Sequence, residues 1–197
     1  MTRIVAGSAK GRTLKVPAKG TRPTSERVRE ALFSRLEHLG YVDGCEVLDL
    51  YAGSGALGLE AASRGAAYVE CVESSRQAAA LIKQNVRELG LAVVVANTKV
   101  QTWLAGPPNR RFDLVVVDPP YDLSEEELAA NLEALMPHLA GDALVVVERS
   151  VRSPEPTWPA GLERDDDRRW GDTRAWSAVV AEHEELNLSD LQTRLGS

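Results

Sequence analysis

The central part of the chain alternates short apolar segments with segments of helical period, and this alternation restricts the fold more than any other feature. Strand-like apolar segments occupy residues 45–50, 67–72, 91–96, 112–117 and 143–148. Helical patterns fall at about 56–64, 75–89, 99–104 and 124–139. Short, nearly all-apolar strands separated by helices predict a parallel α/β sheet covered on both faces. Residues 176–182 add a last strand, and antiparallel pairing of the final two strands would give about seven.

The N-terminal part has a different pattern. Residues 3–6 and 12–16 are short extended runs around a glycine-bearing loop, which predicts a small β-hairpin. A helix is expected after it, capped by Thr24 or Ser25 and ended by Gly40. Its expected apolar face is formed by Val28, Ala31, Leu32, Leu36 and Leu39. The 197 residues correspond to about one domain with a small extension.

Charge is distributed unevenly along the chain. Residues 1–37 carry a net charge of +6, whereas residues 38–197 carry −12, within a total of −6. Binding of a polyanion needs a local positive face and not a positive total. The basic N-terminal part is therefore a candidate for nucleic-acid contact, with a merely solvated segment as the alternative.

A glycine loop follows the first central strand and opens a helix. Gly53, Gly55 and Gly58 match the Gly-x-Gly-x-x-Gly pattern, in which glycine permits positive φ and close approach to a ligand. The pattern predicts a nucleotide-type cofactor at the carboxyl end of the sheet. Asp49 would repel a pyrophosphate but suits the ammonium and sulfonium of S-adenosylmethionine. Glu73 ends the next strand and is placed for ribose hydroxyls, which either cofactor class could offer.

The most specific motif is Asp118-Pro119-Pro120-Tyr121, directly after a buried strand. The prolines fix the backbone and predict a stiff turn beside the glycine loop. The Asp118 carboxylate and the Pro119 carbonyl can accept both N–H groups of an exocyclic amine, which turns the nitrogen lone pair toward a methyl donor. Tyr121 can stack on an unpaired base. These four residues are the candidate catalytic group for methylation of a planar amine.

Several motifs together resemble one family, the bacterial 16S rRNA (guanine-N2)-methyltransferases of the RsmD type, within the class I S-adenosylmethionine-dependent methyltransferases. The segments that carry the resemblance are Arg3–Gly7, Lys10–Leu14, Arg22–Phe33, Asp49–Ala61, Asp118–Tyr121 and Trp170–Thr173. The resemblance implies a Rossmann-like, seven-stranded, mostly parallel sheet with an antiparallel edge strand and a small basic N-terminal hairpin and helix. It divides the chain into an RNA-contacting extension (1–22), a methyltransferase domain (23–183) and a polar tail (184–197).

The resemblance also implies a monomeric enzyme that methylates N2 of a guanine in 16S rRNA, in the small subunit or an assembly intermediate. The implied cofactor residues are Asp49, Tyr51, Gly53, Gly55, Glu73, Lys99, Val100 and Asp118. The implied RNA-contacting residues are Arg3, Lys10, Arg12, Arg22, Thr24 and Arg27. Related enzymes often place an acid where Lys99 stands, so adenine is expected to be held mainly by backbone N–H groups and apolar contacts.

Three alternatives stay open at this point. An amino-methyltransferase of DNA or another RNA would use the same motif on adenine N6 or cytosine N4. A nicotinamide-dependent oxidoreductase would use the glycine loop, and a non-catalytic ribosome-assembly factor would keep only the fold. Cys45 and Cys71 are expected in the core, and the three scattered His residues predict no metal site. No leader or membrane span is apparent, so we expect a cytoplasmic protein.

Overall fold

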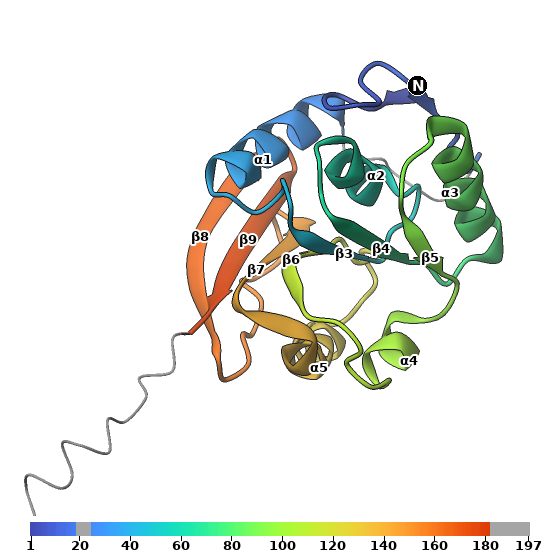
Figure 1. Ribbon diagram of the computed structural model, residues 1–197. Coiled ribbons are helices and arrows are strands. Elements are labelled where there is room, and N and C mark those ends of the chain that lie inside the picture. Colours follow the sequence, from blue (N-terminus) through green and yellow to red (C-terminus); the bar gives the residue numbers. More distant parts are fainter. Residues whose placement is uncertain (19–24, 182–197) are drawn as a thin grey trace, which may run out of the picture.

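The computed structural model describes residues 1–18 and 25–181. The short strands β1 (Thr2–Arg3) and β2 (Thr13–Leu14) pair antiparallel near the N-terminus. A seven-stranded sheet in the order β5-β4-β3-β6-β7-β9-β8 forms the centre of the molecule (Figure 1). The five strands β5, β4, β3, β6 and β7 run parallel to one another, and β9 runs antiparallel to both of its neighbours, β7 and β8. The predicted seven-stranded, mostly parallel sheet is confirmed.

Strands and helices alternate through the chain as the apolar pattern predicts. The strands of the large sheet are β3 (Glu46–Leu50), β4 (Tyr68–Val72), β5 (Val94–Ala96), β6 (Phe112–Val117), β7 (Leu139–Ser150), β8 (Leu162–Trp170) and β9 (Thr173–Val180). The helices are α1 (Glu26–His38), α2 (Ala56–Ser63), α3 (Arg76–Leu89), α4 (Val100–Leu104) and α5 (Glu125–Leu135), with a 3-10 turn at Met136–His138.

The sheet separates two apolar layers. Helices α1, α2 and α3 cover one face, and α4 and α5 cover the other (Figure 1). Strand β6 shows the alternation, because Leu114 and Val116 pack with α1 whereas Val115 and Val117 pack with α5. All four side chains are buried, so this strand is apolar on both faces. A strand of this kind holds the turn that follows it at a fixed place.

Helix α1 buries part of the face that the sequence pattern predicts, and it also buries Arg29 and Phe33. Ser25 caps the helix, since its hydroxyl accepts a hydrogen bond from the Val28 N–H. The buried residues are Arg29, Leu32, Phe33 and Leu36, whereas Leu39 is exposed. The expectation was confirmed for Leu32 and Leu36 and wrong for Leu39, which lies past the end of the helix. Arg29 is buried in an ion pair, with its Nε 3.2 Å from Glu60 Oε2 of α2.

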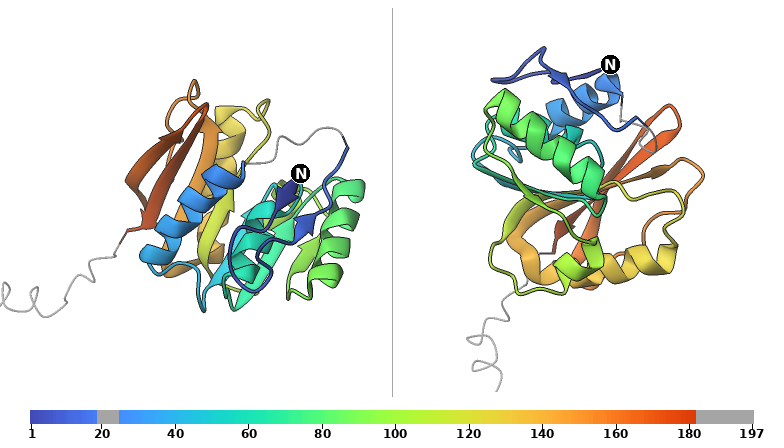
Figure 2. Two further views of the ribbon diagram at one scale, coloured as in Figure 1. Left: turned by 90° about the horizontal axis from the view of Figure 1, so that it is seen from above. Right: turned by 90° about the vertical axis from the view of Figure 1, so that its right-hand side faces the viewer.

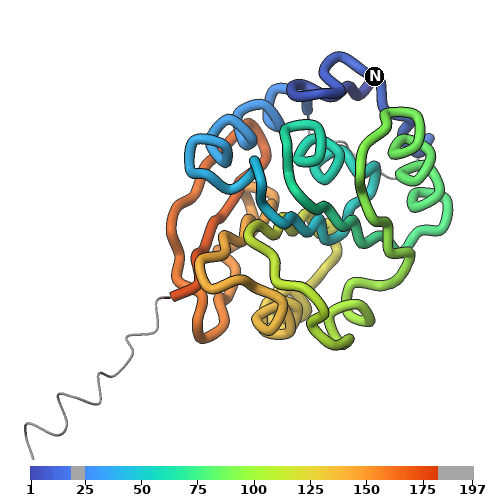
Figure 3. The backbone as a smooth tube through the Cα atoms, viewed as in Figure 1, coloured from blue at the N-terminus to red at the C-terminus, as the bar shows by residue number. Residues whose placement is uncertain are grey.

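The N-terminal extension lies on the outer side of α2 and α3, as both views in Figure 2 show. The Glu60 carboxylate accepts hydrogen bonds from the Val5 and Ala6 N–H groups, each at 3.0 Å. At Gly7, where φ is +82°, an added Cβ would lie 1.8 Å from the Ser63 carbonyl oxygen. Only glycine permits this approach. The dark-blue N-terminal tube therefore rests against helices that are far away in sequence (Figure 3).

Apolar contacts complete the docking of the extension. Ile4, Ala9 and Leu14 are buried against Ala56 and Leu59 of α2. No helix among the described residues is long and apolar enough to cross a membrane.

Candidate active site

Three acidic residues stand at the carboxyl ends of neighbouring parallel strands. Asp49 is the penultimate residue of β3, Glu73 directly follows β4, and Asp118 directly follows β6. The strand order β4-β3-β6 places β3 between the other two. Since the carboxyl ends of parallel strands meet at one edge, the structure brings these three carboxylates together at the usual binding edge of an open α/β sheet.

The glycine loop connects β3 to α2 at this edge. Gly53 and Gly55 have φ of 56° and 76°, in the left-handed region that favours glycine. Gly58 lies one turn into the helix, where an added Cβ would lie 2.4 Å from Cys71 Sγ. The third glycine thus lets α2 pack closely on β4, and the first two shape the loop above it. The geometry matches the roles of glycines in a nucleotide-binding loop.

Asp49 is a buried carboxylate with one oxygen in use. Its Oδ2 accepts a hydrogen bond from the Gly58 N–H at 2.9 Å. Its Oδ1 is buried and has no hydrogen-bond partner in the structure. Burial, together with a smaller effect of the nearby Asp118 and Glu73 carboxylates, raises the pKa of Asp49 to about 7. A cationic ligand group at Oδ1 would supply the missing partner and favour the ionised form.

A hollow of about 300 Å³ opens beside the glycine loop, at the lower end of the size range of small-molecule sites. Its lining residues come from β3, β4 and α4 and the segments beside them: Tyr51, Val72, Glu73, Ser74, Lys99, Val100 and Gln101. Glu73 is held by the N–H groups of Gly53 and Ser75, each donating at 2.7 Å. The hollow includes four of the residues that the resemblance assigns to the cofactor, Tyr51, Glu73, Lys99 and Val100.

Tyr51 has the only positive φ among the described residues other than glycine, at 60°. Such a backbone costs free energy for a bulky residue and needs compensation. The Tyr51 hydroxyl accepts hydrogen bonds from Asn131 Nδ2 at 2.6 Å and from Gln101 Nε2 at 3.4 Å. Sequence reasoning missed both partners. Asn131 had a detectable signal, a polar side chain on the apolar face of α5.

The Asp118–Tyr121 turn lies at the same edge. The Asp118 N–H donates to the Leu50 carbonyl at 3.5 Å, which connects the turn to the end of β3. Burial raises the pKa of Asp118 to about 6. Pro119 is buried and Pro120 is exposed, while the Tyr121 residue is 74% exposed. The arrangement leaves one aromatic ring in the open beside a desolvated carboxylate.

The candidate RNA-contacting residues lie on the outer surface of the extension and α1. Arg3, Lys10, Arg12 and Arg27 are exposed. Arg3 pairs with Glu26 at the start of α1, with Nη2 and Oε2 3.3 Å apart. Arg12 Nη2 donates to the Glu88 carbonyl near the end of α3 at 3.0 Å. Arg22 and Thr24 lie outside the described residues, as does the tail at 184–197.

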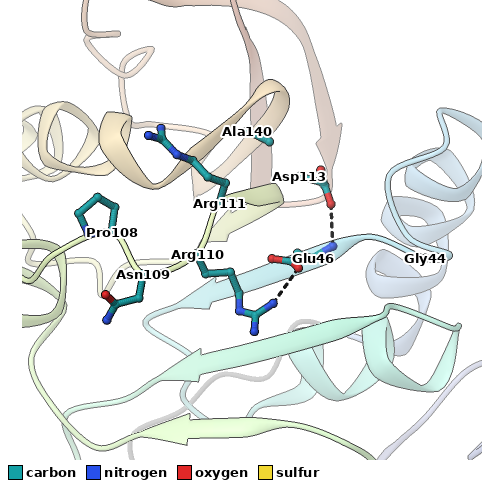
Figure 4. A pocket seen from close by; sticks show the side chains of 8 residues that line it. All are labelled: Gly44, Glu46, Pro108, Asn109, Arg110, Arg111, Asp113 and Ala140. Atoms are coloured by element: carbon teal, nitrogen blue, oxygen red, sulfur yellow. Dashed lines mark hydrogen bonds and ion pairs between the residues drawn. The ribbon is translucent and has the colours of Figure 1, made fainter.

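A larger hollow of about 660 Å³ lies at the opposite, amino edge of the sheet (Figure 4). Each of its charged groups already has a partner within the chain. Arg110 Nη1 lies 2.7 Å from Glu46 Oε1, and Asp113 Oδ2 accepts from the Glu46 N–H at 2.8 Å (Figure 4). The Arg110 guanidinium also lies 3.8 Å from the centre of the Tyr68 ring. These satisfied groups offer a ligand little, so the size of this hollow does not make it the better site.

Metal chemistry finds no support in the residues that the structure describes. No three His, Cys, Asp or Glu side chains there are grouped as ligands of a metal ion. Cys71 is buried and Cys45 is partly buried, and burial raises the pKa of each thiol. Neither is a reactive thiolate.

Comparisons with known proteins agree with this geometry. A family model described as "Conserved hypothetical protein 95" matches residues 2–178. Ribosomal RNA small subunit methyltransferase D of Escherichia coli K12 is 41% identical over 163 residues, which cover 80% of this chain and 79% of that protein. The Haemophilus influenzae protein of the same name is 38% identical over 157 residues, 77% of this chain and 80% of that protein.

Solved structures give the same result. The Escherichia coli protein yhhF superimposes with a TM-score of 0.78 at 33% identity, over 90% of this chain and 97% of that one. Magnesium protoporphyrin IX methyltransferase of Synechocystis, solved with bound S-adenosylmethionine, shares the fold at a TM-score of 0.63 and 16% identity over 79% of each chain. The chain therefore belongs to the conserved hypothetical protein 95 family, together with the ribosomal RNA small subunit methyltransferases D, on a class I methyltransferase fold.

Proposed function

We propose that the protein transfers a methyl group from S-adenosylmethionine to the N2 amine of a guanine in 16S rRNA, within the small ribosomal subunit or an assembly intermediate. The observation that carries the proposal is the meeting of Asp49, Glu73 and the Asp118 turn at one edge of the sheet. Relatives at 41% and 38% identity are named small subunit rRNA methyltransferases, which supports rRNA as the substrate class. The choice of guanine N2 rests on the family resemblance.

The residues present fit the cofactor. The unpartnered Asp49 Oδ1 suits the ammonium group of a methionine moiety. Glu73 keeps lone pairs for ribose hydroxyls, because two backbone N–H groups already fix its direction. Buried Val100 and half-buried Tyr51 provide apolar surface for adenine. A pyrophosphate would meet two carboxylates here, which disfavours a nicotinamide dinucleotide.

The chain performs the reaction mainly by positioning. When bound, S-adenosylmethionine supplies an electrophilic methyl group on a sulfonium sulfur. The Asp118 carboxylate and the Pro119 carbonyl accept the two N–H groups of the amine and direct its lone pair. Tyr121 stacks on the base from the open side of the turn. As the nitrogen–carbon bond forms and the sulfur–carbon bond breaks, the nitrogen becomes cationic and releases a proton to Asp118 or water. With a pKa of about 6, Asp118 is mostly ionised near neutral pH and can take that proton.

The RNA would lie across the exposed cations of the extension and α1. Arg3, Lys10, Arg12 and Arg27 leave their charged ends accessible for phosphates. Arg3 is paired with a surface carboxylate and Arg12 with a helix carbonyl, and a phosphate can replace either partner at low cost.

The test is transfer of labelled methyl groups to unmodified 30S subunits, naked 16S rRNA and duplex DNA, followed by digestion and nucleoside identification. N2-methylguanosine from the subunit or the rRNA is expected, and the preferred form identifies the assembly stage. Labelled methyladenine or methylcytosine would overturn the substrate but keep the fold and the role of Asp118. No transfer to any substrate, with S-adenosylmethionine still bound, would favour a non-catalytic assembly factor.

A further inference from the structure

The turn that holds the target amine needs support that its own backbone does not supply. Pro119 and Pro120 donate no backbone hydrogen bond. The N–H of Asp118 reaches Leu50 at 3.5 Å, and the Leu123 N–H donates to the Pro120 carbonyl at 3.1 Å. With Tyr121 largely exposed, packing does not fix the tip either. The position of the turn therefore depends on how its downstream end is held.

Arg149 holds that end. It is the penultimate residue of β7, the neighbour of β6 in the sheet, and its side chain is only 5% exposed. Its Nη2 donates to the Leu123 carbonyl at 3.1 Å and to Glu125 Oε1 at 2.5 Å. Arg149 thus connects the rim of the sheet to the last part of the turn and to the first residue of α5.

The energetics of the Arg149 contacts with Leu123 and Glu125 favour one fixed geometry. A buried guanidinium is costly unless it is paired, and Glu125 is well placed to pair because the helix N-terminus stabilises its negative charge. A hydrogen bond from a charged donor to a carbonyl is stronger than one between two neutral groups. The planar guanidinium also fixes direction, which an ammonium group does not. Arg149 Nε and Glu125 Oε2 are buried without a hydrogen-bond partner, so the pair is not optimised for stability alone.

We infer that Arg149 is a positioning residue for methyl transfer: through the Leu123 carbonyl and Glu125 it sets where Pro119 and Tyr121 stand relative to the methyl donor. This inference rests on the proposed function of the Asp118 turn. Arg149 is not among the residues that line the hollow beside the glycine loop. It lies on the opposite side of β7 from the layer that contains Asp49, because Val145 and Val147 on the same side of the strand pack with α5.

The experiment compares Arg149→Lys and Arg149→Met with the wild-type chain under single-turnover and steady-state conditions. We expect Arg149→Met to lower kcat about 10- to 100-fold, the scale of losses when a reacting group is misplaced by about 1 Å. The S-adenosylmethionine Kd should stay within about twofold, because the cofactor hollow does not include Arg149. Arg149→Lys should keep part of the kcat that Arg149→Met loses, because a lysine ammonium group can still pair with Glu125.

A merely structural role would give a different result. The fraction of molecules that bind S-adenosylmethionine, measured by titration, corrects for misfolded protein. If kcat per binding-competent molecule were unchanged in Arg149→Met, the inference would be wrong. The matched control is Arg164→Met, which removes an exposed arginine that pairs with Asp167 on β8 and should leave kcat unchanged.

The inference and the proposed function fail in separable ways. If the wild-type chain methylated a base other than guanine, the effect of Arg149 could be measured on that base and the inference would survive. If the wild-type chain bound S-adenosylmethionine but transferred nothing to any substrate, the proposed function would fall and the inference with it. Normal wild-type transfer with an unaffected Arg149→Met would overturn the inference alone.

Discussion

The two edges of the central sheet carry similar side chains in opposite states. At the amino edge, Glu46 and Asp113 are engaged by Arg110 and by a backbone N–H. At the carboxyl edge, burial raises the pKa of Asp49 to about 7 and that of Asp118 to about 6. Asp113 lies near the start of β6, and Asp118, five positions later, directly follows the same strand. The contrast teaches that accumulated carboxylates alone do not make a site. A candidate site needs carboxylates that the fold removes from water and leaves with few hydrogen-bond or ion-pair partners.

Unpartnered polar atoms follow the same division. Among the described residues, those of Asp49, Glu125, Arg149 and Trp176 lie at or near the carboxyl edge. Native proteins satisfy most buried polar groups, so exceptions that gather in one place call for a functional reason. The predictions below test whether the two edges differ in function as they do in chemistry.

The largest effect is expected at Asp118, directly after β6, in contrast to Asp113 near the start of that strand. Asp118→Ala should lower kcat by about 100- to 10,000-fold, because it removes an acceptor of the target amine and a proton acceptor. Asp113→Ala is the matched control and should leave kcat within about twofold, since it lies at the far edge. Methyl transfer to the preferred rRNA substrate measures both. Equal losses in the two variants would abolish the functional contrast between the edges.

A smaller effect is expected at Asp49. Asp49→Asn should weaken S-adenosylmethionine binding by about 10- to 100-fold, as expected for one charge-assisted hydrogen bond of about 1.5–3 kcal/mol. Isothermal titration measures this directly. In the wild-type chain, affinity should rise as pH increases through about 7, where Asp49 ionises. An Asp49→Asn variant with the same affinity and the same pH dependence would contradict the assignment.

The same group makes a prediction for stability. The folded state keeps a proton on Asp49 up to a pKa of about 7, whereas the unfolded chain loses it near the ordinary aspartate pKa of 3.8. Between these values the folded state binds more protons, so the contribution of Asp49 to the free energy of unfolding should fall as pH rises. Above about 7 it should become constant. Urea unfolding at pH 5 and pH 8 should show a smaller pH difference in Asp49→Asn than in the wild-type chain.

The pH profile of kcat should separate the two acids. At saturating cofactor, activity should decline as pH falls through about 6, because Asp118 becomes protonated and no longer accepts from the amine. Asp118→Asn removes that titration, so its residual activity should be flat in this range. If the decline in kcat near pH 6 persisted in Asp118→Asn, the titration would belong to another group.

The smallest effects are expected at surface cations. Arg12→Ala should weaken RNA binding a few-fold and lower the magnitude of the salt slope by about one, with cofactor affinity unchanged. Arg110→Ala is its control at the amino edge, and it should change RNA affinity by less than about twofold. Filter binding at several salt concentrations distinguishes them. A larger salt effect in Arg110→Ala than in Arg12→Ala would move the RNA path to the amino edge.

The sheet was predictable because its signals are local. Apolar runs and glycine turns predicted where β3 to β7 lie along the chain, and Asp118-Pro119-Pro120 marked the end of β6. Strand β7 begins at Leu139, earlier than the expected 143, because Gly141 and Asp142 continue the strand. The charged segment 165–169, which has no apolar pattern, is part of the edge strand β8.

Side-chain pairings between distant segments were not predictable. Arg29 has no local signal for burial, yet it is fully buried against Glu60, 31 positions away. Tyr51 was assigned to the cofactor site by resemblance, but its bonds to Asn131 and Gln101 depend on tertiary packing. Arg149 carries no local motif at all. Such contacts depend on strand order and crossing geometry, which periodicity does not encode.

The docking of the N-terminal extension has a consequence for how the chain acquires its shape during synthesis. Val5 depends on Glu60, which is made 55 residues later, and Lys15 depends on Asn85, 70 residues later. The segment that leaves the translating ribosome first therefore has no surface to fold on until α2 and α3 have followed. Long-range contacts of this kind form slowly. The basic surface would thus be completed only after the glycine loop, α2 and α3 have been synthesised, and before Lys99, Val100 and Asp118 have followed.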